Sequence, residues 1–249
     1  MCGIVGVTGN DRSVSILIDG LKRLEYRGYD SAGIYVNDEK GHDYLVKRSG
    51  RISNLEAALT PEVKGLAGIG HTRWATHGVP SETNAHPHYS NDERFYLVHN
   101  GVIENYQQLK EEYLKGVEFK SQTDTEVIVQ LVDKFVVDYK MDTKDALLKV
   151  LRLISPDSSY AFALMDREQP DTLFVAKNKS PLLVGLCQGY NMVGSDAMSM
   201  IDETNEFMEI NDHELVIVKP DNVTIEEFDG TEKKRDSFKV DMDPSATDK

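Results

Sequence analysis

A cysteine, Cys2, directly follows Met1 in the opening run Met1 to Val7. If Met1 is removed, Cys2 carries both a thiol and an α-amine, whose unperturbed pKa is about 7.7–8.0. The amine can accept the thiol proton and later return it to a leaving group, so one residue supplies a nucleophile and its base. With Met1 retained, that chemistry is blocked. The alternative is a small buried thiol that starts an edge strand, the commoner role of a free cysteine.

A second candidate is the run His71 to Gly78, HTRWATHG. It combines a cation, an aromatic ring, hydroxyls and imidazoles, a mixture with no obvious role in a core. A loop that carries such residues is a better candidate for function than for packing. Taken alone, however, Arg73 could be a surface cation and Trp74 a core residue.

Two further segments carry polar groups in defined positions. Asn100-Gly101 follows a strand-type run, and this dipeptide is typical of a hairpin turn. Thr123 and Glu126 have the spacing of a capping box, with Thr123 as N-cap and Glu126 at the third helical position. Asp124 then lies in the first turn of a helix, where the helix dipole favours a carboxylate whether or not it binds a ligand.

Composition excludes several classes of protein. The chain has 249 residues, 40% of them apolar, which suits one globular domain. Its formal net charge of -14 disfavours binding to nucleic-acid phosphates, and no basic amphipathic helix indicates a membrane surface. We expect no signal peptide and no transmembrane segment. With only 2 cysteines a disulfide framework is implausible, and a reducing cytoplasm fits best.

The order of secondary-structure patterns predicts an α+β fold. Helical spacing occurs over residues 14–24, behind Thr123, and over 144–153. Short β-type runs with turn signals between them favour antiparallel sheets covered by helices rather than a βαβ array. These runs are 4–7, 32–36, 44–48, 69–72, 95–99, 160–165, 172–176, 182–186, 192–194, 207–210, 214–218 and 223–228.

Taken together, these segments resemble the class II, or N-terminal nucleophile, glutamine amidotransferases. The resemblance rests on six blocks that occur in the family's order: MCGIVG, LEYRGYDSAGI (Leu24 to Ile34), HTRWATHG, NAHPH (Asn84 to His88), VHNGVIENY (Val98 to Tyr106) and TDTE. The tyrosine of EYRGYD and the tryptophan of HTRWATHG favour the branch that passes ammonia to fructose 6-phosphate. The resemblance implies a four-layer αββα sandwich of the N-terminal nucleophile hydrolase type, with two antiparallel sheets.

The resemblance also implies how L-glutamine is bound. On matching positions, Arg73 holds the α-carboxylate, which suits a planar guanidinium, and Asp124 holds the α-ammonium. Thr76 and His77 line the glutamine pocket, and Trp74 lies on a loop that closes over it and excludes water.

For the chemistry, the resemblance implies a γ-glutamyl thioester on Cys2, which releases ammonia and is then hydrolysed to glutamate. The side-chain amide of Asn100 and the backbone N–H of Gly101 form an oxyanion hole, with donors placed where negative charge develops. No cofactor is expected. The alternatives are another amidotransferase of the superfamily, with phosphoribosyl pyrophosphate or aspartyl-adenylate as acceptor, and a glutamine-binding module without turnover.

Residues 1–240 are expected to form the glutaminase domain, and residues 241–249 the start of a linker to sugar-phosphate isomerase domains that this chain lacks. The full-length form of such a protein is expected to be a homodimer. His86 and His88 could bind zinc from one face of a strand, but no third ligand is indicated, so we expect no metal site. Cys187 lies in an apolar strand and is expected to be inert.

Overall fold

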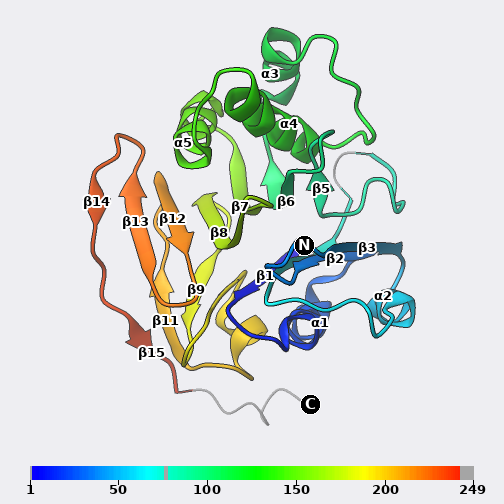
Figure 1. Cartoon of the computed structure of the whole chain (residues 1–249), viewed down its shortest axis with the longest axis vertical. Helices are drawn as coiled ribbons and strands as arrows, with labels where there is room; N and C mark the ends of the chain where they lie inside the picture. The colour runs from blue at the N-terminus through cyan, green and yellow to red at the C-terminus, as the bar shows by residue number, and fades with distance from the viewer. Residues whose placement is uncertain (1, 76–77, 242–249) are drawn as a thin grey trace.

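Two antiparallel sheets lie face to face, and helices cover the outer face of each, so the chain forms four layers (Figure 1). The structure is a computed structural model, and it describes residues 2–75 and 78–241 of the chain. The α+β sandwich with two antiparallel sheets that the sequence predicts is confirmed.

The first sheet has the strand order β15-β11-β9-β10-β1-β4-β2-β3, so β1 lies inside it and β3 at one edge. Gly3 of β1 pairs with Thr72 of β4, which places Cys2 beside the end of β4. The strands are β1 (Gly3–Thr8), β2 (Ser31–Asn37), β3 (Asp43–Ser49), β4 (Ala67–Arg73), β9 (Leu183–Leu186), β10 (Asn191–Gly194), β11 (Glu206–Glu209) and β15 (Phe238–Lys239).

The second sheet has the order β14-β13-β12-β8-β7-β6-β5, with β5 at the edge nearest to β3 of the first sheet. Its long central strands, β6 to β8, are buried along most of their length. The strands are β5 (His88–Tyr89), β6 (Phe95–Val102), β7 (Ser159–Asp166), β8 (Gln169–Asn178), β12 (Glu214–Val218), β13 (Val223–Glu227) and β14 (Glu232–Lys233).

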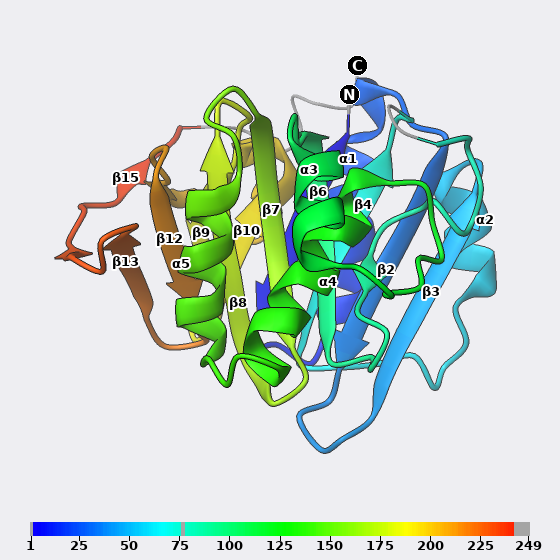
Figure 2. The ribbon, with the colours of Figure 1, turned by 90° about the horizontal axis from the view of Figure 1, so that it is seen from above.

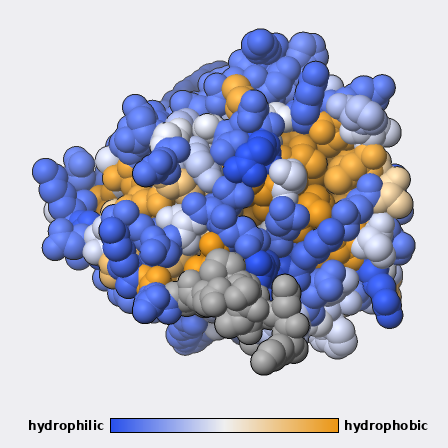
Figure 3. Space-filling view, turned by 90° about the horizontal axis from the view of Figure 1, so that it is seen from below, coloured by the Kyte–Doolittle hydropathy of each residue, from blue (hydrophilic) through white to orange (hydrophobic). Residues whose placement is uncertain are grey.

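Helices cover the two outer faces unequally. Three lie across the second sheet in Figure 2, namely α3 (Tyr106–Tyr113), α4 (Asp124–Val137) and α5 (Thr143–Leu153). The first sheet is covered by α1 (Ser13–Arg23) and the short α2 (Ile52–Ala58). Figure 3 looks onto this side of the molecule, where two hydrophobic areas are separated by a band of hydrophilic residues.

Three apolar clusters hold the four layers together. One joins the helices α3 to α5 to the second sheet, one lies between the sheets, and one joins α1 and α2 to the first sheet. Strand β1 shows why its sequence is apolar on both faces: Ile4 packs between the sheets, whereas Val5 and Val7 pack against the helix side. Successive side chains of a strand point to opposite faces, and both faces of β1 contact an apolar cluster. Its alternating side chains therefore differ in the cluster that they contact and not in their polarity.

The structure corrects the hairpin prediction for Asn100-Gly101. These residues do not form a turn, because β6 continues through them to Val102 and Gly101 pairs with Tyr160 of β7. Gly101 has a φ of 110°, and a Cβ there would lie 2.0 Å from the carbonyl oxygen of Ser159. Only glycine can continue the strand in this conformation. The C-terminal segment also holds a strand that its polar composition did not indicate, since Phe238 pairs with Phe207.

Candidate active site

Cys2 lies at the start of β1, where its thiol contacts the backbone of the neighbouring strand. The N–H of Trp74 donates to Cys2 Sγ over 3.1 Å, and Sγ lies 3.4 Å from the Trp74 carbonyl oxygen. The carbonyl oxygen of Cys2 accepts from the guanidinium of Arg27 over 3.3 Å. The thiol is therefore held at one place, at the end of two paired strands.

The environment of Cys2 keeps its thiol protonated at neutral pH. Burial raises the pKa of Cys2 above its usual value, while the hydrogen bond from Trp74 and the positive charge of Arg73 offset part of the shift. Because the thiolate is the reactive form, a thiol in this setting needs a base to take its proton.

Two opposite charges face the same cavity as Cys2. Arg73, at the end of β4, and Asp124, the first residue of α4, are both 3% exposed, and both line a cavity that Cys2 also lines. Arg73 donates to the carbonyl oxygens of Val79 (3.3 Å) and Gly78 (3.2 Å). A guanidinium and a carboxylate in one cavity match the two charges of an amino-acid backbone.

The start of α4 fixes the position of Asp124. Thr123 is the N-cap, as predicted, and its Oγ1 accepts from Glu126 N over 3.3 Å. The reciprocal half of the capping box differs from the prediction, because the Glu126 carboxylate accepts from the N–H groups of Lys120 (2.9 Å) and Ser121 (2.6 Å) further upstream. One oxygen of Asp124 accepts from Ile103 N over 2.8 Å, so the carboxylate is tied to the loop that follows β6.

The cavity itself is small in this structure, about 30 Å³. That volume is enough for a water molecule or two and far below what a molecule of ten heavy atoms requires. Trp74, which is 54% exposed, lines it directly after β4. A ligand of amino-acid size therefore fits only if this cavity widens, and Trp74 is an exposed residue of its wall.

Asn100 is held in one orientation by a buried histidine. His71 Nε2 lies 3.0 Å from the carbonyl oxygen of His99 and 2.8 Å from the Oδ1 atom of Asn100. A carbonyl oxygen only accepts, so Nε2 must carry the proton, and the Asn100 atom that faces it must then be the acceptor. The amide nitrogen consequently points away from His71, and it donates one of its two hydrogens to the hydroxyl oxygen of Ser195 over 3.5 Å.

His71 can play this part because it is neutral. It is fully buried, and burial lowers its pKa to about 3. Its other ring nitrogen, Nδ1, has no hydrogen-bond partner among the described residues, and its ring stacks on that of His86 with centroids 4.0 Å apart. Ser195 in turn accepts from Ile4 N over 2.8 Å, so the same hydroxyl contacts Asn100 and β1, the strand that follows Cys2.

The remaining histidines of this region are engaged in hydrogen bonds. His86 Nδ1 accepts from the backbone N–H of His99 (3.2 Å), and His88 Nε2 lies 3.0 Å from Thr123 Oγ1. Burial lowers the pKa of both rings well below the usual value. In residues 2–75 and 78–241, no three His, Cys, Asp or Glu side chains are arranged to hold a metal ion.

The structure brings most of the predicted site residues together. Cys2, Arg73, Trp74, Gly101 and Asp124 line one cavity, whereas Asn100 lies beside it with its amide engaged by His71 and Ser195. Thr76 and His77 lie outside the described residues.

Sequence reasoning gave no role to several residues that shape the site. His71 fixes Asn100, Ser195 links Asn100 to β1, and Asp30 accepts from Ala75 N over 2.7 Å. Asp30 and His71 lie within two of the six sequence blocks that carry the family resemblance, so a role in the site could have been predicted for both. Ser195 follows an ordinary strand and offered none.

Comparison with known proteins now agrees with this geometry. Residues 62–222 match the family model described as glutamine amidotransferase domain, and the chain belongs to that family. Over its full 249 residues it is 60% identical to glutamine–fructose-6-phosphate aminotransferase (isomerizing) of Lactiplantibacillus plantarum, and over 245 residues 59% identical to that of Streptococcus pneumoniae. It covers 41% and 40% of those two proteins, so the chain spans about two fifths of their length.

Solved structures show the same fold. A glutamine phosphoribosylpyrophosphate amidotransferase of B. subtilis, complexed with ADP and GMP, superimposes with a TM-score of 0.78 at 27% identity. The match covers 91% of this chain and 49% of that protein. Within the part of the chain that the structure describes, no helix has the length and apolar character needed to span a bilayer.

Proposed function

We propose that this chain hydrolyses L-glutamine to L-glutamate and ammonia through a thioester on Cys2. The observation that carries the proposal is the placement of the Cys2 thiol in one cavity with a buried cation, Arg73, and a buried carboxylate, Asp124. These charges suit the α-carboxylate and α-ammonium of the substrate. The side-chain amide of glutamine then extends toward the thiol.

The first chemical step needs a base, since burial raises the pKa of the thiol. Once Met1 is removed, the α-amine of Cys2 takes the thiol proton, and the sulfur attacks the side-chain amide carbon. The oxygen that becomes negative accepts hydrogen bonds from Asn100 Nδ2 and Gly101 N. When the tetrahedral intermediate collapses, the carbon–nitrogen bond breaks and the protonated α-amine returns its proton to the departing ammonia.

The second half of the reaction consumes water. The α-amine accepts a proton from a water molecule, whose oxygen attacks the thioester carbon and again places negative charge in the oxyanion hole. Collapse breaks the carbon–sulfur bond and releases glutamate, and the protonated α-amine returns its proton to the sulfur, which restores the thiol. Movement of Trp74 admits glutamine and then closes the cavity.

We infer that the ammonia serves a sugar phosphate in the complete protein. The relatives at 59–60% identity are named for the conversion of fructose 6-phosphate, whereas the phosphoribosylpyrophosphate amidotransferase is 27% identical. The higher identity favours fructose 6-phosphate as acceptor and glucosamine 6-phosphate as product, with the isomerase domains of the full-length protein as partner. The domain boundary near residue 240 and the homodimer stay predictions.

The two cysteines of the described residues are free thiols, which fits a reducing compartment and supports a location in the cytoplasm. Glutamate release by chain from which Met1 has been removed, compared with Cys2→Ala, tests the main proposal. We expect release only with the thiol present. Labelling of Cys2 by a diazo-ketone analogue of glutamine separates turnover from binding alone: a module that only binds would gain thermal stability with glutamine and leave Cys2 unlabelled.

A further inference from the structure

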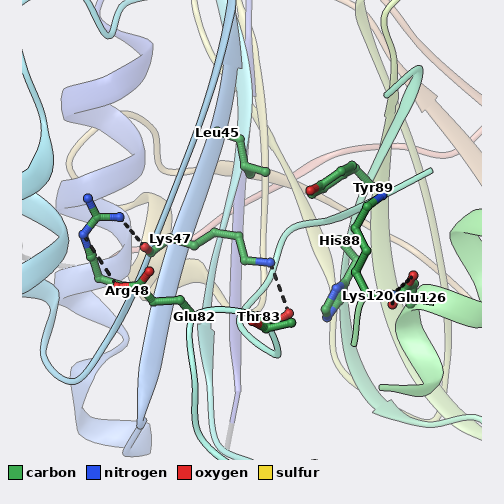
Figure 4. Close-up of a pocket in the computed structure, with 9 residues that line it drawn as sticks. All are labelled: Leu45, Lys47, Arg48, Glu82, Thr83, His88, Tyr89, Lys120 and Glu126. Atoms are coloured by element: carbon green, nitrogen blue, oxygen red, sulfur yellow. Dashed lines mark hydrogen bonds and ion pairs between the residues drawn. The ribbon is translucent and has the colours of Figure 1, made fainter. Parts of the chain in front are cut away.

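A second, larger cavity opens where the edges of the two sheets meet. It has a volume of about 400 Å³ and lies between the edge strands β3 and β5, as Figure 4 shows. Among the residues that the structure describes, none lines both this cavity and the Cys2 cavity. Its volume is within the range of sites for small molecules, roughly 300–1,000 Å³.

One wall of this cavity holds a lysine at an inward-facing position. Lys47 is on the same face of β3 as Leu45, which packs against the cluster between the sheets, whereas Val46 packs on the opposite, helix side. Figure 4 shows the Lys47 side chain extending across the cavity toward Thr83. The register of the strand thus places an ammonium group where an apolar side chain would ordinarily lie.

Lys47 has little to compensate its charge. Its ammonium donates one long hydrogen bond, 3.4 Å, to the carbonyl oxygen of Thr83, and no carboxylate in the described part of the chain lies within 4.0 Å of it. Burial lowers the pKa of Lys47 to about 8, although the negative charges of Glu126 and Glu82 act against the shift. Lys47 is only partly exposed to solvent, and an anion in the cavity would stabilise its partly desolvated ammonium group.

The acidic groups of the cavity are already engaged. Glu126 accepts from the backbone N–H groups of Lys120 and Ser121, and Glu82 lies 3.9 Å from the guanidinium of Arg48. A second ammonium, that of Lys120, lies over the ring of Tyr89 at 4.4 Å and donates only to an amide oxygen, 2.9 Å away on Asn91. Within the described residues it makes no ion pair either.

We propose that this cavity binds a small phosphate monoester, with its dianionic phosphate held by the ammonium groups of Lys47 and Lys120. Two ammonium groups match two negative charges, whereas a single carboxylate would leave one of them uncompensated. Lysine is a common phosphate ligand because it acts as a compact point charge with three donors. The cavity is larger than a phosphate ion, and Tyr89 and Thr83 offer polar partners to a hydroxylated body.

An inward lysine has another known role, the protection of a free sheet edge from pairing with a second molecule, and that role requires no ligand. Only the first role, ligand binding, requires that a phosphate group binds to the Lys47 ammonium. Acetylation of Lys47 by an amine-reactive ester, followed by peptide mass spectrometry at pH 8, reports this directly. The 249-residue chain with Cys2→Ala serves as the protein, so the result does not depend on glutamine hydrolysis.

Glycerol 3-phosphate is the main probe, with inorganic phosphate and chloride at matched ionic strength beside it. At ten times the dissociation constant of the ester, we expect acetylation of Lys47 to slow about tenfold, because about one site in eleven is then empty. The exposed Lys115 is the matched control, and its rate should not change. Equal protection of Lys115, or protection of Lys47 by chloride, overturns the proposal. Inorganic phosphate that binds as tightly as the ester overturns the assignment to a monoester.

Two substitutions locate the site. Lys47→Met keeps the aliphatic stem and removes the charge, and we expect it to weaken binding of glycerol 3-phosphate at least tenfold in titration calorimetry. Lys120→Met, at the exposed rim, should do the same without risk to the core, while Lys115→Met should bind like the parent. Parent-like affinity of a folded Lys47→Met or Lys120→Met chain would rule the site out.

Discussion

Replacing His71 by leucine should lower kcat for glutamine hydrolysis without an equal rise in KM. The substitution removes the donor that holds the Asn100 oxygen 2.8 Å away, so the amide can rotate and present its oxygen instead of its nitrogen to the developing oxyanion. His71 is thus a positioning residue, since it does not line the cavity.

The magnitude follows from that hydrogen bond. In the variant the productive orientation leaves the buried Asn100 oxygen without a donor, whereas a rotated amide places that oxygen against the hydroxyl of Ser195. An unsatisfied buried acceptor costs about 1–3 kcal/mol, so the productive orientation lies higher in free energy than the rotated one by about that amount. At about 1.36 kcal/mol per factor of ten, kcat should fall roughly 5- to 150-fold. This is less than the loss of the amide itself, because the rotated amide still returns to the productive orientation part of the time.

Steady-state glutamate release and a melting curve on the same protein test the reasoning. His71→Gln, which can still donate through its side-chain amide, should recover part of kcat, and exposed His42→Leu should match the parent. The kcat ratio of His71→Leu to the parent should be the same at pH 6 and pH 8, because the pKa of His71 lies at about 3 and the ring is neutral at both. A folded His71→Leu chain with parental kcat would refute the positioning role.

Three further predictions concern the same region. Asn100→Ala should lower kcat about 10²–10³-fold with KM nearly unchanged, and a normal kcat in a destabilised protein would withdraw Asn100 from the oxyanion hole. Arg73→Ala should cost about 3–5 kcal/mol in kcat/KM, since a buried carboxylate of the substrate loses its partner, and a change below about tenfold would contradict this role. The depressed pKa values of His71, His86 and His88 mean that the unfolded chain binds more protons below pH 6.5. Stability should therefore be complete above that pH and fall toward pH 3, by at most about 4 kcal/mol per pH unit from the three rings, and unfolding curves with no acid dependence between pH 6 and pH 4 would contradict it.

The periodic segments of the sequence predicted most of the fold. Alternation and helical spacing located α1, α5 and the strands β7 to β13 to within a few residues. The short helices α2 and α3 were not predicted, since each spans few residues and buries one or two side chains, such as Leu55 or Leu109. The sequence also did not predict that β6 continues through Gly101. Asn-Gly favours a turn locally, and only the pairing of Gly101 with the neighbouring strand β7 overrides that preference.

The site could be predicted only as far as its residues carry chemical signatures. Cys2, Arg73 and Asp124 stand out by type and position, and the structure places them around one cavity. The contribution of His71 depends on which of its nitrogens carries the proton, which follows from the carbonyl oxygen of His99 rather than from the sequence. Long-range contacts of this kind set the orientation of a side chain, and no local sequence pattern indicates them.

The position of β1 between β4 and β10 has a consequence for hydrogen–deuterium exchange. Val5 to Val7 are paired with a strand on each side, and the N–H of Ile4 donates to the hydroxyl of Ser195, so these amides should exchange only when the whole chain unfolds. Trp74, by contrast, is exposed on the wall of the small cavity, and we expect it to move for each substrate molecule. Cys2 would then be anchored in slowly exchanging backbone, while substrate access would depend on the more exposed Trp74. Heat should therefore weaken glutamine binding at temperatures where the backbone around Cys2 still retains its deuterium label.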